Sequence, residues 1–206
     1  MLDLLPPGEK RKQFELRALS LRDFAGVKGE QPLDPFALAE FARLLVVDFD
    51  SIEGLSAESR AHLLGEAADQ WSGGACARPL PNGWKLVILN PAHGQQRNRA
   101  TLMEEVAHVF LGHTPNRLAI NPKKSVASQG TAARDYNHDD EEAAYAVGAA
   151  ALVPYAALRR LVFRGSNGAQ IARHFRVSRQ LVEYRIKVTH LWAEYKRAST
   201  TRAEHV

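Results

Sequence analysis

Glu104, Glu105 and His108 form the group of side chains in this sequence best suited to metal-dependent hydrolysis. On a helix, residues four positions apart leave the same face, so Glu104 and His108 could together hold one metal ion. Glu105 follows at about 100° round the helix, where its carboxylate could act as a general base toward a water molecule. The alternative is an exposed Glu–His pair, which stabilises a helix by only a few tenths of a kcal/mol.

The helix that must carry these three residues is predicted from about Arg97 to His113. Its apolar side chains recur at helical spacing, which indicates one buried stripe that the three candidates largely avoid. The residues of this stripe are Leu102, Val106, Val109 and Phe110. His113 lies about 140° round a continuous helix from His108, which makes it a poor co-ligand, and we expect it to cap the helix end.

The chain before this helix is expected to form two further helices and a hairpin. A helix is predicted over 36–47, with Asp34 as its N-cap, and another over 56–71. The dipeptide Asn-Gly between the extended segments 75–80 and 84–90 predicts a β-hairpin. If 84–90 lies at an exposed edge of the sheet, it can receive an extended peptide by strand addition.

The chain after this helix is expected to begin with a long loop, 114–138, of a length that is usually functional or mobile. The acidic pair Asp139 and Asp140 then favours a helix start, because negative charge stabilises the N-terminal end of the helix dipole. The predicted helices are 139–153, 155–163, 169–175 and 179–197.

Three blocks of sequence, at 88–113, 141–154 and 171–185, share a recognisable order. A strand ending in Asn90 is followed by Arg-x-x-x-Thr-Leu and Glu-Glu-Val-Ala-His, and later by a glutamate-led helix of small residues that ends before Pro154. This arrangement resembles the ImmA/IrrE family of metallopeptidases over roughly residues 36–190. The family has His-Glu-x-x-His where this chain has Glu104 to His108.

The resemblance implies a zincin-like fold in which a glutamate from a second helix completes the metal site. Glu141 occupies that place if the sequences are aligned on Pro154 without a gap. Glu142 is the alternative, and either residue could instead compensate the helix dipole. Glu105 stands at the place of the family's general base, whereas Glu104 replaces a histidine ligand.

Zinc is the cofactor that the resemblance implies, and the additional carboxylate also suits harder ions such as Mn or Fe. Three possibilities follow: a zinc peptidase with an atypical ligand, an enzyme with another metal, or a degenerate site that no longer hydrolyses. By resemblance, the substrate is a protein, namely a helix-turn-helix transcriptional repressor whose cleavage switches on a stress or mobile-element response.

Residues 170–185 resemble a helix-turn-helix, with Ser178 as N-cap of the second helix. Arg179, Gln180 and Arg185 could then contact DNA phosphates or base edges. Residues 155–206 hold eleven Lys or Arg and three Asp or Glu, which suits an anionic partner. The alternative is a helical packing module that supports the metal helix or recognises a protein substrate.

The single cysteine, Cys76, excludes an internal disulfide and fits a reducing cytoplasm. We expect it to be a buried, small apolar residue. No signal-peptide pattern opens the chain, and its longest uncharged run, 143–158, falls short of the ~20 apolar residues of a membrane span. No element is predicted for residues 1–30, whose basic start at 10–12 is expected to be flexible.

We therefore predict an α+β, mainly helical chain. Residues 1–154 are expected to form a zincin-like metallopeptidase domain with a small β-sheet, followed by a helix-turn-helix-like helical bundle at 155–206. The leading hypothesis is a cytoplasmic, metal-dependent endopeptidase that acts on a repressor and has no membrane partner. The alternative is a catalytically degenerate transcriptional regulator that binds DNA or a repressor protein through 155–206.

Overall fold

The computed structural model describes residues 4–76, 79–113 and 137–203. Its helices are α1 (Glu9–Phe24), α2 (Pro35–Phe41), α3 (Ala57–Leu64), α4 (Gln95–Phe110), α5 (His138–Leu152), α6 (Tyr155–Phe163), α7 (Gly168–Phe175), α8 (Arg179–Val188) and α9 (Trp192–Ala203). Its strands are β1 (Leu44–Val47), β2 (Gly73–Ala75) and β3 (Lys85–Leu89). The predicted α+β, mainly helical class is confirmed. Most of the predicted loop 114–138 lies outside the described residues.

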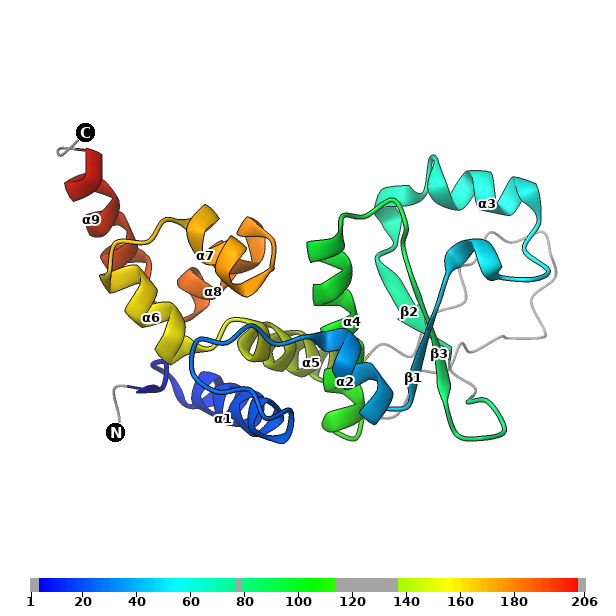
Figure 1. The fold of residues 1–206 in the computed structure, drawn as a ribbon, viewed down its shortest axis with the longest axis horizontal. Coiled ribbons are helices and arrows are strands. Elements are labelled where there is room, and N and C mark those ends of the chain that lie inside the picture. Colours follow the sequence, from blue (N-terminus) through cyan, green and yellow to red (C-terminus); the bar gives the residue numbers. More distant parts are fainter. Residues whose placement is uncertain (1–3, 77–78, 114–136, 204–206) are drawn as a thin grey trace.

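The elements are arranged with the sheet and α3 toward one end and α6 to α9 toward the other (Figure 1). Helices α1, α4 and α5 lie between these ends, and α4 packs against α5 as well as against β2 and β3. This arrangement makes α4 and α5 the centre of the molecule. Both helices carry candidate site residues, so the site lies on helices that pack against several other elements.

The sheet has the strand order β1-β3-β2, with β1 parallel and β2 antiparallel to β3. The predicted antiparallel pairing is confirmed, since Gly73 lies opposite Leu89 and Ala75 opposite Val87. The first strand is Gly73–Ala75, however, and not the predicted 75–80. The expectation that segment 84–90 is an exposed edge is wrong. Strand β3 has neighbours on both sides, and its buried Val87 is fully enclosed. The edges of the sheet are β1 and β2.

Strand β1 replaces the second half of the helix predicted over 36–47. Helix α2 ends at Phe41, and Arg43 adopts the left-handed conformation with φ 52°, which turns the chain into the strand. Leu44 to Val47 form an uninterrupted apolar run, whose periodicity alone cannot separate a helix from a buried strand. The β-branched Val46 and Val47, together with parallel pairing to β3, favour the strand.

Two other predicted helices are shorter than expected. The helix predicted over 56–71 ends at Leu64, where Gly65 follows as its C-cap. The helix predicted over 179–197 is divided into α8 and α9, because His190 adopts a φ of 61° between them. The bounds of α6 are those predicted, 155–163, since Pro154 fixes its start.

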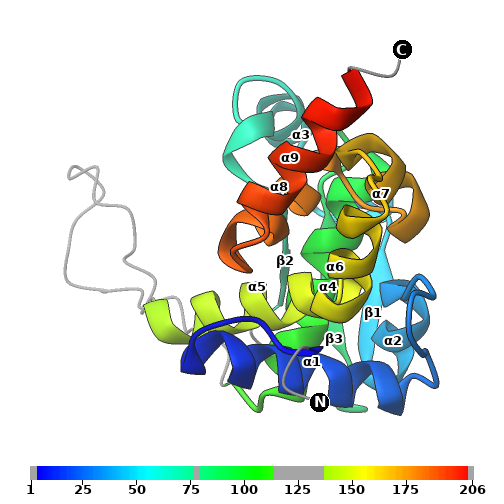
Figure 2. The same ribbon diagram turned by 90° about the vertical axis from the view of Figure 1, so that its left-hand side faces the viewer.

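Helix α1 was not expected, and its basic residues at 10–12 belong to a regular helix rather than a flexible start. Figure 2 shows α1 lying along α5, and the two helices are in contact. The buried face of α1 contains Ala18 and Leu21 but also the charged Glu15 and Arg22. A helix that buries charged residues has little apolar periodicity, which explains why hydrophobic patterning did not reveal it.

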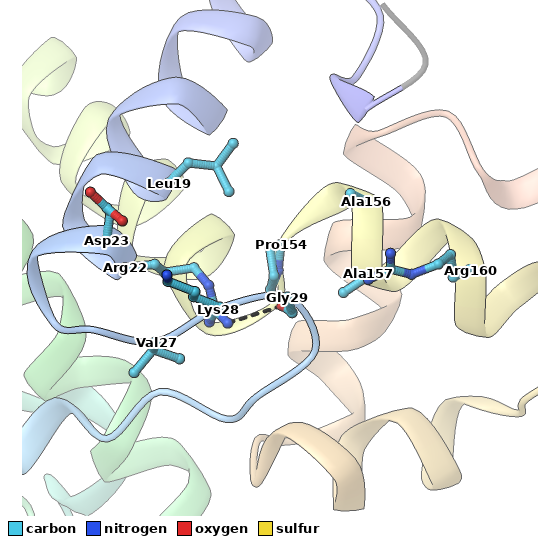
Figure 3. Close-up of a pocket in the computed structure, with 10 residues that line it drawn as sticks. All are labelled: Leu19, Arg22, Asp23, Val27, Lys28, Gly29, Pro154, Ala156, Ala157 and Arg160. Carbon is cyan, nitrogen blue, oxygen red and sulfur yellow. Dashed lines mark hydrogen bonds between the residues drawn. The ribbon is translucent and has the colours of Figure 1, made fainter. Parts of the chain in front are cut away.

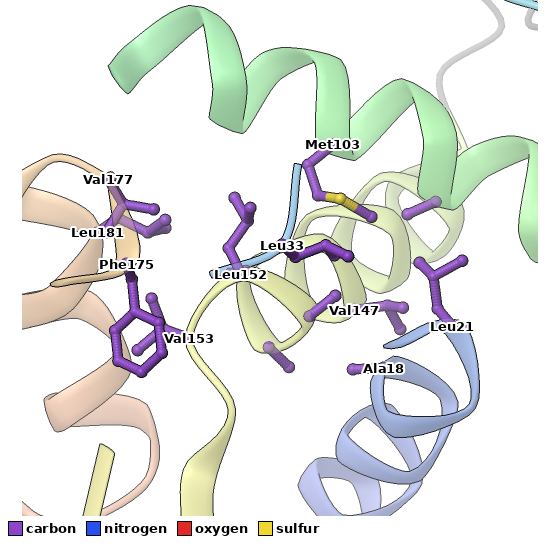
Figure 4. Close-up of a cluster of buried hydrophobic side chains, with 14 of the residues drawn as sticks. Ala18, Leu21, Leu33, Met103, Val147, Leu152, Val153, Phe175, Val177 and Leu181 are labelled. Atoms are coloured by element: carbon purple, nitrogen blue, oxygen red, sulfur yellow. The ribbon is translucent and has the colours of Figure 1, made fainter. Parts of the chain in front are cut away.

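The hydrophobic core is centred on the small-residue helix α5 (Figure 4). Val147 of α5 packs among Leu21 of α1 and Met103 of α4, and the cluster continues to Phe175 of α7 and Leu181 of α8. The division of the chain at residue 154 stays a prediction. Within the described residues, no single helix is long and apolar enough to span a membrane; α5 and α6 meet that test only as a pair bent by 52°.

Candidate metal centre

Helices α4 and α5 approach closely where Gly148 faces the backbone of α4. A Cβ atom at Gly148 would lie 3.2 Å from the carbonyl oxygen of Met103 and 3.4 Å from the amide nitrogen of Glu104. The glycine therefore allows α5 to approach α4 more closely than most other residues would at this position. Glu141 precedes Gly148 by seven residues, or about two turns, so it lies on the same face of α5. The packing thus directs Glu141 toward the face of α4 that carries Glu104.

Glu104, His108 and Glu141 are brought together by this packing. One potential ligand atom from each residue lies within 4.8 Å of the other two. His108 Nε2 is 3.6 Å from Glu141 Oε2, and the two side chains are 21% and 27% exposed, so the group is reachable from solvent. The predicted convergence of residues from two separate helices on one point is therefore present.

Glu142, the alternative ligand of the sequence analysis, points elsewhere. Its Oε2 accepts a hydrogen bond from Lys10 Nζ at 2.8 Å, and its side chain is 43% exposed. That hydrogen bond lowers the pKa of Glu142 below its ordinary value. The geometry therefore groups Glu141, and not Glu142, with Glu104 and His108.

The charges of the group suit a bound cation. Burial, the largest cause, and the negative charges of Glu105 and Glu141 together raise the pKa of Glu104 to about 7. Burial also lowers the pKa of His108, which favours the neutral imidazole that a metal ion needs. Among the described residues, Glu104 forms no ion pair with Lys or Arg. A divalent cation would relieve this crowding.

The donor set also fits a catalytic metal ion. Two carboxylates and one imidazole provide three protein ligands, and catalytic zinc sites use three protein ligands and keep one open position. Glu105 is half-buried and lies near enough to raise the pKa of Glu104 by its charge. The role of Glu105 as general base stays a prediction.

His113 was expected to be a poor co-ligand that caps the helix end, and the structure agrees with both expectations. Its backbone N–H does cap the helix, donating to the His108 carbonyl oxygen at 3.0 Å. Its ring, however, reaches back to His108, with 3.1 Å between the two Nδ1 atoms. Helix α4 ends at Phe110, and Gly112 with φ 72° reverses the chain, so the angle of a continuous helix does not apply. Gly112 is the residue in the sequence that indicates this reversal of the chain.

The predicted apolar stripe of α4 is correct only in its first half. Leu102 and Val106 are buried, whereas Val109 and Phe110 are 36% and 41% exposed. Cys76 is a free, half-buried thiol rather than a fully buried residue.

The proposed DNA-contacting residues of α8 divide into two groups. Arg179 and Gln180 are exposed, and Arg179 forms an ion pair with Glu183 at 2.7 Å. Arg185 is buried and bound to Glu15, so the expectation that it contacts DNA is wrong. Its position on the inner face of α8 follows from its spacing to the buried Leu181. The helix-turn-helix interpretation of α7 and α8 stays a prediction.

A separate hollow of about 340 Å³ lies between the end of α1 and the junction of α5 with α6 (Figure 3). None of the residues that line it belongs to the metal-binding group. Two of its cations are already engaged, since Arg22 donates to backbone carbonyls of Ala151 and Gln31 and Arg160 pairs with Glu30.

Comparison with known families agrees with this geometry. A peptidase family model described as the IrrE N-terminal-like domain matches residues 72–187, more than half of the 206-residue chain. The matched region contains all of α4 and α5, and therefore the whole of the candidate site. No curated protein matches the chain.

Proposed function

The chain belongs to the ImmA/IrrE family of metallopeptidases, and on that premise we propose that it is an endopeptidase with Glu104, His108 and Glu141 as its metal ligands. The observation that carries this proposal is the convergence of one donor atom from each residue within 4.8 Å. Zinc is the proposed ion, because three protein ligands with one open position is its usual catalytic arrangement. Mn and Fe are the alternatives that two carboxylates would also suit.

The ion, when bound, would polarise the scissile carbonyl and lower the pKa of a water molecule. The chain's own residues supply the rest of the chemistry. Glu104, His108 and Glu141 bind and orient the ion, and their partly buried position limits access of bulk water. The Glu105 carboxylate takes a proton from the attacking water and passes it to the nitrogen of the leaving amine.

The proposed substrate is an extended segment of a protein, specifically a helix-turn-helix transcriptional repressor in the cytoplasm whose cleavage starts a stress or mobile-element response. The peptide would add to β2, which is an edge strand adjoining α4. Gly73 of β2 lies so near α4 that a Cβ atom there would be 2.9 Å from Thr101 Cγ2. Strand addition at β2 would therefore bring a peptide backbone alongside the helix that carries Glu104 and Glu105.

Metal analysis of the purified chain tests the proposed ligands. We expect the wild type and Glu142→Gln to bind one divalent ion per chain. Glu141→Gln should weaken Zn²⁺ binding by more than the ~10–100-fold typical of outer-shell partners, because it removes a ligand. Glu104→His should keep the ion and retain or increase peptidase activity. A wild type without stoichiometric metal would instead favour the non-enzymatic regulator that binds DNA or a repressor through 155–206.

The pH dependence of metal binding follows from Glu104, whose pKa is raised to about 7 by burial and by the charges of Glu105 and Glu141. Below that pH its carboxylate is mostly protonated, so a metal ion must displace a proton. The apparent affinity for Zn²⁺ should therefore fall by up to about tenfold for each pH unit below 7. Chelator competition between pH 8 and pH 5.5 measures this slope. An affinity that stays constant across the range contradicts the assignment of Glu104 as a ligand.

A further inference from the structure

His108 is connected on its side remote from Glu141 to a second pair of polar side chains. Its Nδ1 lies 3.1 Å from Nδ1 of His113, and Nε2 of His113 lies 3.5 Å from Oδ1 of Asp140. Asn137 fixes Asp140 in turn, because its Nδ2 donates to Asp140 Oδ2 at 2.8 Å. A continuous polar chain therefore runs from the start of α5 to the ring of His108.

The short contact between the two rings restricts where their protons lie. Two nitrogens 3.1 Å apart share one proton, so one ring donates and the other accepts. When both rings are neutral, only one further proton remains. It resides either on Nε2 of His108, facing Glu141, or on Nε2 of His113, facing Asp140.

These two arrangements have opposite consequences for metal binding. If Nε2 of His108 carries the proton, it has no lone pair to offer an ion. If Nε2 of His113 carries it, His108 donates through Nδ1 and keeps the lone pair on Nε2 free. Asp140 favours the second arrangement, because a carboxylate attracts an N–H and repels a nitrogen lone pair. Glu141 favours the first for the same reason, and a cation bound between Glu141 and His108 would remove that preference.

We propose that His113 and Asp140 are positioning residues that fix the tautomer and ring orientation of His108, so that its Nε2 faces the metal ion. The inference rests on the proposed metal site and adds to it two residues that touch neither ion nor substrate. The His113 side chain is only 12% exposed, and its ring meets that of His108 edge to face at 72°, so the ring is held in place. Hydrogen bonds of this kind to ligand histidines tune metal affinity.

The test compares the Zn²⁺ and Co²⁺ affinities of the wild type with those of His113→Ala and Asp140→Asn, by chelator competition. Both variants should bind about 10–100-fold more weakly. His113→Gln should recover part of the loss, since its amide oxygen can accept from His108 Nδ1. Asp139→Asn is the matched control: it removes the same charge from the same exposed helix start and should change affinity by about twofold at most.

Two spectroscopic readouts separate positioning from a general structural effect. In ¹⁵N NMR spectra of the metal-free protein, the fraction of His108 that carries its proton on Nδ1 should be lower in Asp140→Asn than in the wild type. The visible absorption bands of the Co²⁺-loaded protein should change in His113→Ala but not in Asp139→Asn.

The outcomes distinguish this inference from the proposed function. If the wild type binds the ions and the folded variants His113→Ala and Asp140→Asn bind them with the same affinity, the inference alone is overturned. An equal fraction of Nδ1-protonated His108 in the wild type and in Asp140→Asn would overturn it as well. A wild type that binds neither ion would overturn the inference together with the metal site itself.

Discussion

Replacing Glu105 by glutamine should reduce kcat for peptide hydrolysis by about 10²–10⁴-fold, the contribution typical of a general base. Glutamine has nearly the same shape as glutamate but cannot accept the proton of the attacking water. Because Glu105 is not one of the three grouped ligands, the variant should bind its metal ion as the wild type does. KM should change little, since the carboxylate acts on water rather than on the bound peptide.

The assay for this prediction needs no known substrate. A proteome-derived peptide library, incubated with metal-loaded protein and read by mass spectrometry, reports cleavage sites, and the best peptide then serves for kinetics. Glu142→Gln is the matched control, because it makes the same chemical change at an exposed residue bound to Lys10. A Glu105→Gln variant that keeps more than a tenth of the wild-type rate would exclude Glu105 as the base. Hydrolysis absent from the metal-loaded wild type would favour the regulatory alternative.

The grouping of Glu104 with His108 could be predicted because the signals for it are local. Glu104 and His108 are related by helical spacing, and α5 is bounded by acidic residues in its first turn and by Pro154 after its end. The grouping of Glu141 rather than Glu142 with them depends on how α5 is rotated against α4. That rotation is seen in the close approach of Gly148 to α4 and in the pairing of Glu142 with Lys10, both of which require the folded structure.

The errors have a common physical cause, which is that tertiary contacts override local patterns. Strand β1 was assigned to a helix because its apolar run gains its identity only from pairing with β3. The angle between His113 and His108 was derived for a continuous helix, whereas Gly112 reverses the chain before His113. Arg185 was predicted to contact DNA because its charge suggested an exposed side chain. Its partner in the fold, Glu15, lies 170 residues away in the sequence, so the pairing could not be read from local pattern.

The buried pair of Glu15 and Arg185 gives the second large prediction. Glu15 Oε2 accepts from Arg185 Nη2 at 2.6 Å, and the two side chains are 1% and 6% exposed. Glu15 Oε1 also accepts from the backbone N–H of Tyr155, and Arg185 Nε donates to the carbonyl oxygen of Val153. The pair therefore connects α1 and α8 to the junction between α5 and α6.

Removing one partner of this pair should be far more damaging than removing both charges. Arg185→Met leaves the Glu15 carboxylate buried without its cation and should lower the free energy of unfolding by about 3–5 kcal/mol. Adding Glu15→Gln should restore most of that loss, because no charge remains buried and the glutamine oxygen still accepts from Tyr155 N–H. Urea unfolding of the wild type, both single variants and the double variant measures these differences.

The coupling between the two substitutions provides the check on the cause. If the losses of the two single variants simply add, the pair is not the electrostatic connection between α1 and α8 that its geometry indicates.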